Sequence, residues 1–548
     1  MIKKISLLFI SIITFSVLVH AQSRAEKYWV YFTDKNNSVY SVEHPEAYLS
    51  DAAIQRRAKM HIAINTSDLP VNVDYVKQLQ DAGATVTVES RWLNAVSISV
   101  HDETLLATIA LLPFVSKIEK VKRYQLIDDT GIPVDNTVFY RTTLDDAVSY
   151  GGAFNQNHMI DVDFLHNLGY RGQGIKIAVL DGGFYGVDFG IGFQSLRDKN
   201  QIVETINFPD DNDLVYISST HGSNVLSIMA VDEPGKYIGS APDAEYYLFR
   251  TEVVDSERVV EEDYWMQAAE YADFIGADII NSSLGYTTFD TITEDHTYAD
   301  MDGNTTVATI AADRAAAAGI LVCNSAGNSG DEDWNFIGAP ADADSIMTIG
   351  AVDLNGNYVS FSSQGPTADG RIKPNVAGQG AGTAVMDQTG VVYYGNGTSY
   401  SSPLIAGACA SFMSAFPELT NMQVLEIIQS TASQADNPDN NMGYGIPNFA
   451  KAYLTVKGIE LPEDQMISIM PNPAADVVSI FITAKETGDA QVYIYDIAGH
   501  ILYTQEISMT DGKVIPVFFN NLNILATGMY IIKLVGDVYT ESQKFLVK

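Results

Sequence analysis

The stretch Gly397-Thr398-Ser399-Tyr400-Ser401-Ser402-Pro403 leads directly into the apolar run Leu404-Ile405-Ala406-Gly407-Ala408-Cys409-Ala410. Pro403 lies near the start of the predicted helix, where the fewest hydrogen bonds are lost, and the small residues after it permit close packing. Such a helix is buried, so we expect Ser399 where the core meets the surface, with its backbone N–H at the helix's positive end. A serine nucleophile needs this combination of exposed hydroxyl, fixed position and oxyanion donor. Taken alone, Gly-Thr-Ser is more typical of a turn that caps an ordinary core helix, so the rest of the chain must decide.

Length and composition limit the number of domains, the possible partners and the use of disulfides. With 548 residues the chain is too long for one typical domain, and a hydrophobic content of 46% is ample for packed cores. The net charge of -36 argues against nucleic acid or an anionic membrane surface as a partner. Cys323 and Cys409 are too few for a disulfide framework; we expect buried thiols, although a bridge between them stays open.

The first 21 residues predict a secretory signal peptide. Lys3 and Lys4 precede an apolar run over 5–19, and Val19-His20-Ala21 offers a cleavage site after Ala21. The alternative is an N-terminal membrane anchor, which the run disfavours because a span needs about 20 apolar residues. We therefore expect a secreted protein, located outside the cell or at its surface.

Three units follow. Residues 25–123 predict a small α+β unit, in which Asp74 is a candidate helix cap, and 124–155 have the weak periodicity of a linker. Residues 157–453 alternate uninterrupted apolar strands with helices, which indicates an α/β fold with a parallel sheet. Its predicted strands are 175–180, 246–249, 278–281, 320–323 and 346–352. Residues 462–548 predict an all-β sandwich of short strands separated by turns, and carry no recognisable chemistry.

If Ser399 is a nucleophile, it needs a histidine base and a carboxylate that orients the base. Of the histidines in the α/β domain, His158 and His166 belong to a helical entry segment, and His296 to an acidic loop that we expect to be solvated. His221 opens a helix whose apolar face holds its backbone to the core, although histidines at helix starts are more often structural.

Two more residues stand at predicted strand ends. Asp181 ends the first strand of the α/β domain, where sites form in such sheets, although it could simply cap the turn. Asn328 follows the 320–323 strand, and its side-chain amide can donate to an oxyanion beside the Ser399 N–H. An Asn that tolerates a left-handed turn is the plain alternative. All these weak signals fall at strand ends or helix starts of one domain.

Asp181, His221 and Ser399 occur in the chain order of subtilisin, and the sequence around them resembles the subtilisin-like serine proteases. The resemblance covers about 157–453 and rests on Val179-Leu180-Asp181-Gly182-Gly183, Thr220-His221-Gly222-Ser223, Ala326-Gly327-Asn328 and the Ser399 motif. It implies a catalytic triad, with Asn328 in the oxyanion hole. Gly182 and Asn224 depart from the usual motif residues, which we expect to alter local hydrogen bonding rather than activity.

The resemblance also implies a substrate-binding site. Asn281-Ser282-Ser283-Leu284-Gly285 is similar to the family's substrate-pairing strand, so Ser283, Leu284 and Gly285 are expected to bind the peptide backbone together with Ala326 and Gly327. We expect Gly338 to leave the pocket for the residue before the scissile bond open to a large apolar side chain.

The flanking units also carry resemblances. Residues 25–123 resemble the family's pro-region, a chaperone and temporary inhibitor that is removed on maturation. Residues 462–548 resemble the C-terminal sorting domain of type IX secretion substrates, through Pro471-Asn472-Pro473, Gly528-Met529-Tyr530 and Lys544-Phe545-Leu546-Val547-Lys548. This implies passage across an outer membrane by dedicated machinery.

The sequence therefore predicts a secreted serine endopeptidase that acts on protein or peptide substrates. The alternatives are a non-catalytic surface protein that uses the same scaffold for binding, and an esterase, which the lack of a G-x-S-x-G elbow disfavours. The chemistry requires no cofactor. The family often holds structural calcium, and two acidic loops are the candidates, although solvated loops without a calcium-loop spacing are the simpler interpretation. They contain Asp295, Asp300, Asp302 and Asn304 in one case, and Asp331, Glu332 and Asp333 in the other.

Overall fold

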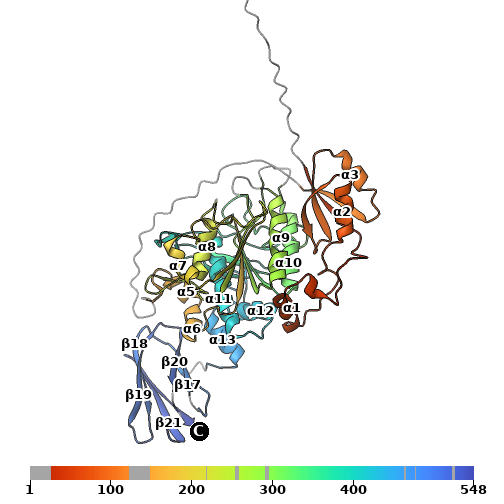
Figure 1. Ribbon diagram of the computed structural model, residues 1–548. Coiled ribbons are helices and arrows are strands. Elements are labelled where there is room, and N and C mark those ends of the chain that lie inside the picture. The colour runs from red at the N-terminus through yellow and green to blue at the C-terminus, as the bar shows by residue number, and fades with distance from the viewer. Residues whose placement is uncertain are drawn as a thin grey trace, which may run out of the picture.

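A seven-stranded parallel sheet runs through the middle of the molecule (Figure 1). The computed structural model describes residues 26–121, 149–217, 219–253, 258–289, 295–461, 465–474, 477–520, 522 and 525–548. The strand order is β13 (Val376–Gln379), β12 (Met347–Val352), β11 (Leu321–Ser325), β10 (Ile279–Ser282), β5 (Lys176–Asp181), β9 (Glu245–Arg250) and β6 (Ile202–Asn207). Because all neighbours in this sheet run parallel, their carboxyl ends share one edge.

The sheet is covered on both faces, as the uninterrupted apolar strands predict. In β5, Ile177 and Val179 belong to one core cluster, whereas Ala178 and Leu180 belong to the cluster on the opposite face. The α/β prediction is confirmed, but it omitted two strands. β6 mixes apolar with polar residues at the sheet edge, and β13 contains a glycine and ends in glutamine, so neither strand is an uninterrupted apolar run in the sequence.

Helices α8 (His221–Ala230) and α11 (Thr398–Ala415) cover one face, and α9 (Val260–Ile275) and α10 (Val307–Ala317) cover the other (Figure 1). The remaining elements of this central domain are α5 (Phe154–Met159), α6 (Val162–Asn167), α7 (Gln194–Asp198), α12 (Asn421–Thr431) and α13 (Phe449–Lys457), with the pairs β7 (Asp232–Glu233) with β8 (Tyr237–Ile238) and β14 (Thr383–Met386) with β15 (Val392–Gly395).

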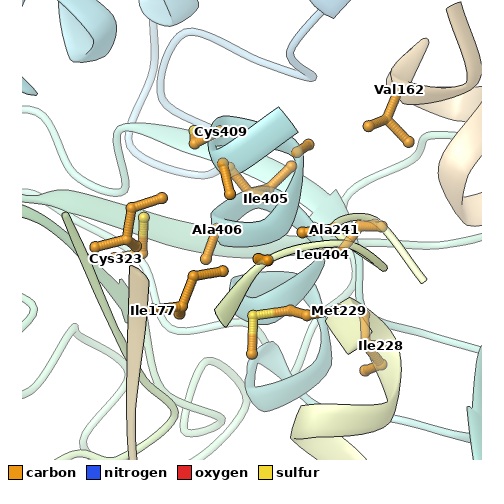
Figure 2. Close-up of a cluster of buried hydrophobic side chains, with 14 of the residues drawn as sticks. Val162, Ile177, Ile228, Met229, Ala241, Cys323, Leu404, Ile405, Ala406 and Cys409 are labelled. Carbon is orange, nitrogen blue, oxygen red and sulfur yellow. The ribbon is translucent and has the colours of Figure 1, made fainter. Parts of the chain in front are cut away.

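Helix α11 is buried along most of its length, and its small residues let it approach its neighbours closely (Figure 2). A Cβ at Gly407 would lie 2.1 Å from the Ser240 hydroxyl oxygen, so only glycine fits there without a shift. Ser402 donates a hydrogen bond of 3.0 Å to the Asn281 side chain on β10. The position of the helix is therefore fixed relative to the sheet.

The N-terminal unit is an antiparallel sheet with helices, ordered β2 (Thr85–Ser90), β3 (Ala95–Val100), β1 (Glu26–Phe32) and β4 (Val115–Val121), with α1 (Asp51–Lys59), α2 (Val73–Asp81) and α3 (Thr104–Ile109). The prediction of Asp74 as the cap of α2 is wrong, because the Asn72 side chain caps this helix by accepting from the Asp74 N–H. Trp29 and Trp92 pack into the core cluster of α9 and α10, so this unit covers those helices (Figure 1).

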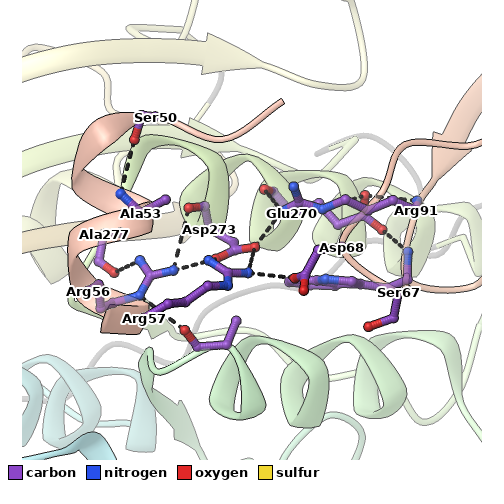
Figure 3. Close-up of polar contacts among 12 residues, drawn as sticks. Ser50, Ala53, Arg56, Arg57, Ser67, Asp68, Arg91, Glu270, Asp273 and Ala277 are labelled. Atoms are coloured by element: carbon purple, nitrogen blue, oxygen red, sulfur yellow. Dashed lines mark hydrogen bonds and ion pairs between the residues drawn. The ribbon is translucent and has the colours of Figure 1, made fainter. Parts of the chain in front are cut away.

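Three arginines of the N-terminal unit converge on Asp273 of α9 (Figure 3). Arg57 binds both carboxylate oxygens at 2.7 Å, Arg91 lies 2.5 Å from one of them, and Arg56 also pairs with this carboxylate. Burial alone would raise the pKa of Asp273, but the three guanidiniums outweigh it and hold that pKa below its ordinary value. The carboxylate is therefore charged and is neutralised by the N-terminal unit.

The C-terminal unit is all-β, as predicted. One sheet contains β16 (Ile467–Met470), β17 (Val477–Thr483) and β20 (Val514–Asn520), and the other contains β19 (Ile501–Met509), β18 (Gly488–Tyr495), β21 (Gly528–Val535) and β22 (Thr540–Val547). Lys513 joins this unit to the central domain: its ammonium lies 2.6 Å from the Asp161 carboxylate and donates to the His158 carbonyl at 2.7 Å.

The Asp273 cluster leads to a stability prediction. Asp273→Ala leaves three buried guanidiniums without their shared carboxylate, which we expect to cost about 3–5 kcal/mol in the free energy of unfolding of the full-length chain. Denaturant unfolding measures this cost. Asp81→Ala is the control, because its ion pair with Lys77 is exposed and contributes little. An Asp273→Ala chain with the wild-type midpoint would contradict the role of the cluster.

Candidate functional site

Asp181 and His221 meet at the carboxyl edge of the sheet. Asp181 is the last residue of β5 and is fully buried, and His221 is the first residue of α8. The His221 Nδ1 lies 2.9 and 3.0 Å from the two carboxylate oxygens of Asp181. One of these oxygens also accepts the Gly182 N–H at 2.7 Å, so both the carboxylate and the imidazole are held in one orientation.

The charge of Asp181 stabilises the protonated form of His221 relative to a ring without this partner. Burial lowers the pKa of His221, but the charge and hydrogen bond of Asp181 outweigh it and raise the pKa above the ordinary value of 6.5. Because Nδ1 faces the carboxylate, Nε2 is the ring nitrogen that remains for proton transfer.

Ser399 lies in the first turn of α11, half-buried, as the sequence predicts. Its hydroxyl donates to the Ser283 carbonyl at 3.3 Å, and the Ser283 hydroxyl donates back to the Ser399 carbonyl at 3.0 Å. Among the described residues, no hydrogen bond joins this hydroxyl to the His221 ring. Hydrogen bonds of this kind are often formed only once substrate is bound, so this geometry does not exclude Ser399 as a partner of His221.

The Asn328 side chain is oriented by the residue before the serine. Its Oδ1 accepts from the Thr398 N–H at 2.8 Å and from the Thr398 hydroxyl at 2.9 Å, which leaves its NH₂ group unused by these contacts. Gly397 has φ of +150°, and a Cβ there would lie 3.7 Å from both Asn328 Nδ2 and the Ser399 nitrogen. The two donors therefore border the same space.

A cavity of about 170 Å³ opens beside Ser399. All the residues that the sequence assigns to substrate binding line it, namely Ser283, Leu284, Gly285, Ala326 and Gly327, together with Asn328 and Gly338. Trp334 and Phe336 also line the cavity, and sequence reasoning missed them. They belong to no strand or helix with a readable period, and only their aromatic character near Asn328 could have indicated them.

The other histidines lie elsewhere. His158 and His166 are on α5 and α6, as expected, and His166 is buried against the Ser240 carbonyl. The prediction that His296 lies in a solvated loop is wrong: its side chain is 11% exposed, and its Nε2 lies 2.6 Å from the buried Glu262. A carboxylate on α9, distant in sequence, draws this loop inward.

In the first candidate calcium loop, carboxylates make local hydrogen bonds, whereas Asp331 of the second accepts from the distant Ser360 hydroxyl. Asp300 caps its own turn by accepting from Thr297, and Asp302 accepts from the Asn304 N–H. Within the described ranges, neither loop gathers three acidic or histidine ligand atoms; the one such group is His158, Asp161 and Asp163. There the cation is the Lys513 ammonium, so these residues join two units of the chain.

Cys323 and Cys409 are free, buried thiols that lie next to each other between β11 and α11. Burial, and then the hydrogen bond with Cys323, raises the pKa of the Cys409 thiol. The structure thus confirms the expectation that both thiols are buried.

In the described part of the chain, no helix combines the length and hydropathy that crossing a bilayer requires.

The carboxyl edge of the parallel α/β sheet carries a serine, a histidine–aspartate pair and an amide donor. This fold and this set of side chains can be compared with known families. The sequence model of the subtilase family matches residues 172–445, and the chain belongs to that family. Residues 27–132 match the peptidase S8 propeptide domain of Bacteroidota, and 468–548 match a secretion system C-terminal sorting domain.

Individual relatives are similar over the central domain. Subtilisin E of Bacillus subtilis is 31% identical over 275 residues, which are 50% of this chain and 64% of that protein. Subtilisin DY of Bacillus licheniformis is 30% identical over 277 residues, 50% of this chain and 89% of that protein. The epidermin leader peptide processing serine protease of Staphylococcus aureus is 16% identical with a TM-score of 0.54, covers 80% of this chain and 100% of its own, and shows a shared fold.

The Asp181–His221 pair generates a prediction about proton affinity. The pKa of His221, measured by NMR titration, should lie above 6.5 in the wild-type chain and fall in Asp181→Asn, because the neutral amide no longer stabilises the imidazolium. Asp188→Asn removes an exposed carboxylate and should leave the His221 titration unchanged. A His221 pKa that is the same with and without the Asp181 charge would contradict the pairing.

Proposed function

We propose that this chain is an exported serine endopeptidase with Ser399 as nucleophile, His221 as general base and Asp181 as the group that orients His221. The observation that carries the proposal is the hydrogen bonding of Thr398 to Asn328, which aims the Asn328 amide at the space beside the Ser399 N–H. Two preorganised donors next to a serine hydroxyl are what an acyl-transfer site needs.

The steps follow from the positions of these groups. As the Ser399 oxygen attacks a peptide carbonyl carbon, its proton passes to Nε2 of His221, and the charge of Asp181 stabilises the imidazolium. The carbonyl oxygen becomes an oxyanion that accepts from Asn328 and the Ser399 N–H. His221 then gives the proton to the leaving amine, an acyl-enzyme forms, and water releases the acyl group by the same sequence.

Substrate binding also prepares the nucleophile. Ser283, Leu284 and Gly285 continue from the end of β10, with Ser283 buried, Leu284 half-buried and Gly285 exposed, and an extended peptide can add along this segment as a strand. The Ser283 carbonyl that a substrate N–H would use now accepts from the Ser399 hydroxyl. A peptide that takes this acceptor frees the hydroxyl to turn toward His221.

The flanking units support a route of maturation and export. We propose that the N-terminal unit assists folding and inhibits the enzyme until it is removed, since it matches a propeptide family and neutralises Asp273 of the central domain. The match of the C-terminal unit to a secretion sorting domain supports export through outer-membrane machinery, and a final location outside the cell or at its surface.

Loss of the nucleophile tests the proposal. Ser399→Ala should abolish casein cleavage, with a fall in kcat of about a millionfold, the magnitude measured for this loss in subtilisin, and should leave the N-terminal unit attached. Ser414→Ala changes a hydroxyl at the other end of α11 and should cleave casein and process itself normally. A Ser399→Ala chain that still processes itself would contradict the assignment.

Loss of the amide donor separates binding from catalysis. Asn328→Ala should lower kcat about 10²- to 10³-fold with little change in KM, because the amide acts on charge that develops only in the transition state. Steady-state kinetics on a fluorogenic peptide measure both constants. A rise in KM with an unchanged kcat would instead place Asn328 in ground-state binding.

A further inference from the structure

Tyr400 stands directly after the nucleophile, and the proposed mechanism gives it no role. Its ring is stacked along the His221 imidazole, with ring centroids 6.4 Å apart and an interplanar angle of 26°. The cavity that Asn328 lines includes Ser399 but neither Tyr400 nor His221. The Tyr400 ring therefore lies along His221 and is not part of the lining of the cavity that Asn328 borders.

The local structure is built around this ring. A Cβ at Gly395 would lie 2.6 Å from Cε2 of Tyr400, so the last residue of β15 leaves space that the ring fills. Burial raises the pKa of Tyr400 and of Tyr393, and the nearby Asn224 side chain opposes this shift in both. Asn224, one of the two departures from the usual motif, thus lies on the helix that carries His221 and close to side chains of both β15 and α11.

A surface of exposed apolar side chains continues from Tyr393, and we name it the aromatic surface. Its members are Tyr185, Phe189, Ile191, Val391 and Tyr393, which are 44%, 61%, 67%, 56% and 37% exposed. The two segments that carry them meet at the β14–β15 turn, because a Cβ at Gly186 or Gly190 would lie 2.5 Å from Gln388. The Tyr185 carbonyl accepts from the Ser223 hydroxyl, which anchors the surface beside His221.

The chemistry assigns an occupant to this side of the site. His221 must give its proton to the leaving amine, so the chain beyond the scissile bond has to pass His221 on the side away from Asn328. Tyr400 borders that path and the aromatic surface continues it. Contiguous exposed apolar groups of this kind normally mark a binding site.

We infer that Tyr400 and the aromatic surface select the leaving-group side of the peptide substrate, an inference that rests on the proposed function. The Tyr400 ring occupies the space next to the scissile bond, so the first residue after the bond has a small side chain. The residue after it is aromatic or large and aliphatic, and packs on the aromatic surface.

The experiment uses the matured wild-type enzyme and quenched fluorescent peptides that are identical before the scissile bond. One pair carries Ala or Phe as the first residue after the bond, and the other carries Gly or Phe as the second. We expect kcat/KM to favour Ala at the first position and Phe at the second by about tenfold each, the scale of discrimination by apolar contact. Mass spectrometry of a proteome digest should show the same preferences after the cut sites.

Matched variants assign each preference to its residue. Tyr400→Ala should reduce the first preference to about twofold or less, whereas Tyr400→Phe should keep it. Phe189→Ser should reduce the second preference and leave the first intact. Val203→Ser is the control, because Val203 is 48% exposed on the edge strand β6 and belongs to no part of the site.

The outcomes separate this inference from the proposed function. Ser399-dependent cleavage of all four peptides at equal kcat/KM would overturn the inference alone, whereas absence of any Ser399-dependent cleavage would overturn the proposed function. A Phe189→Ser chain with unchanged preferences but an altered oligomeric state in sedimentation would assign the aromatic surface to self-association, and would also overturn the inference.

Discussion

The close packing of α11 against the sheet is the constraint on which the rest of the site depends. Gly407 admits the Ser240 side chain, and Ser402 bonds to Asn281 on β10, so the helix cannot slide along the strands. The same strand runs on into Ser283, whose hydroxyl and carbonyl exchange hydrogen bonds with Ser399. One set of contacts therefore holds both the nucleophile and the backbone on which a substrate would lie.

The parallel sheet brings the remaining groups to that point. Asp181 ends β5 and His221 begins α8, so a buried strand and the start of a buried helix position the pair, and the Gly182 N–H also holds the Asp181 carboxylate. Asn328 comes from the loop after β11 and is more exposed, but Thr398 fixes its amide. The donor is thus tied to the residue next to the nucleophile, and a movement of α11 would carry both together.

The opposite face of the sheet is completed by the N-terminal unit. Trp29 and Trp92 share a core with α9 and α10, and in the described part of the chain the ion pairs of Asp273 all come from arginines of that unit. Helix α9 therefore has a buried carboxylate whose charge the N-terminal unit balances, and apolar side chains that the same unit covers. This dependence gives a physical basis for a unit that assists folding of the domain it covers.

Much of this could be predicted from the sequence, because local signals carry it. The apolar strands located β5, β9, β10, β11 and β12, and the residues at their ends and at the helix starts indicated Asp181, His221, Asn328 and Ser399. Contacts between distant side chains have no such local signal. The pairing of His296 with Glu262, the three arginines on Asp273 and the hydrogen bond of Ser399 to Ser283 depend on how separate segments meet. The edge strands β6 and β13 were missed for a different reason: β6 is only partly buried, and β13 is buried but contains a glycine and ends in glutamine, so neither has an uninterrupted apolar run.

The central claim is that the environment of Ser399 makes its hydroxyl nucleophilic, and covalent labelling tests it most directly. A fluorophosphonate probe should modify the matured chain at Ser399 alone, as located by mass spectrometry, and should fail to modify a chain with His221→Ala. Absence of labelling at Ser399 in the wild-type chain, or equal labelling with and without His221, would contradict the account.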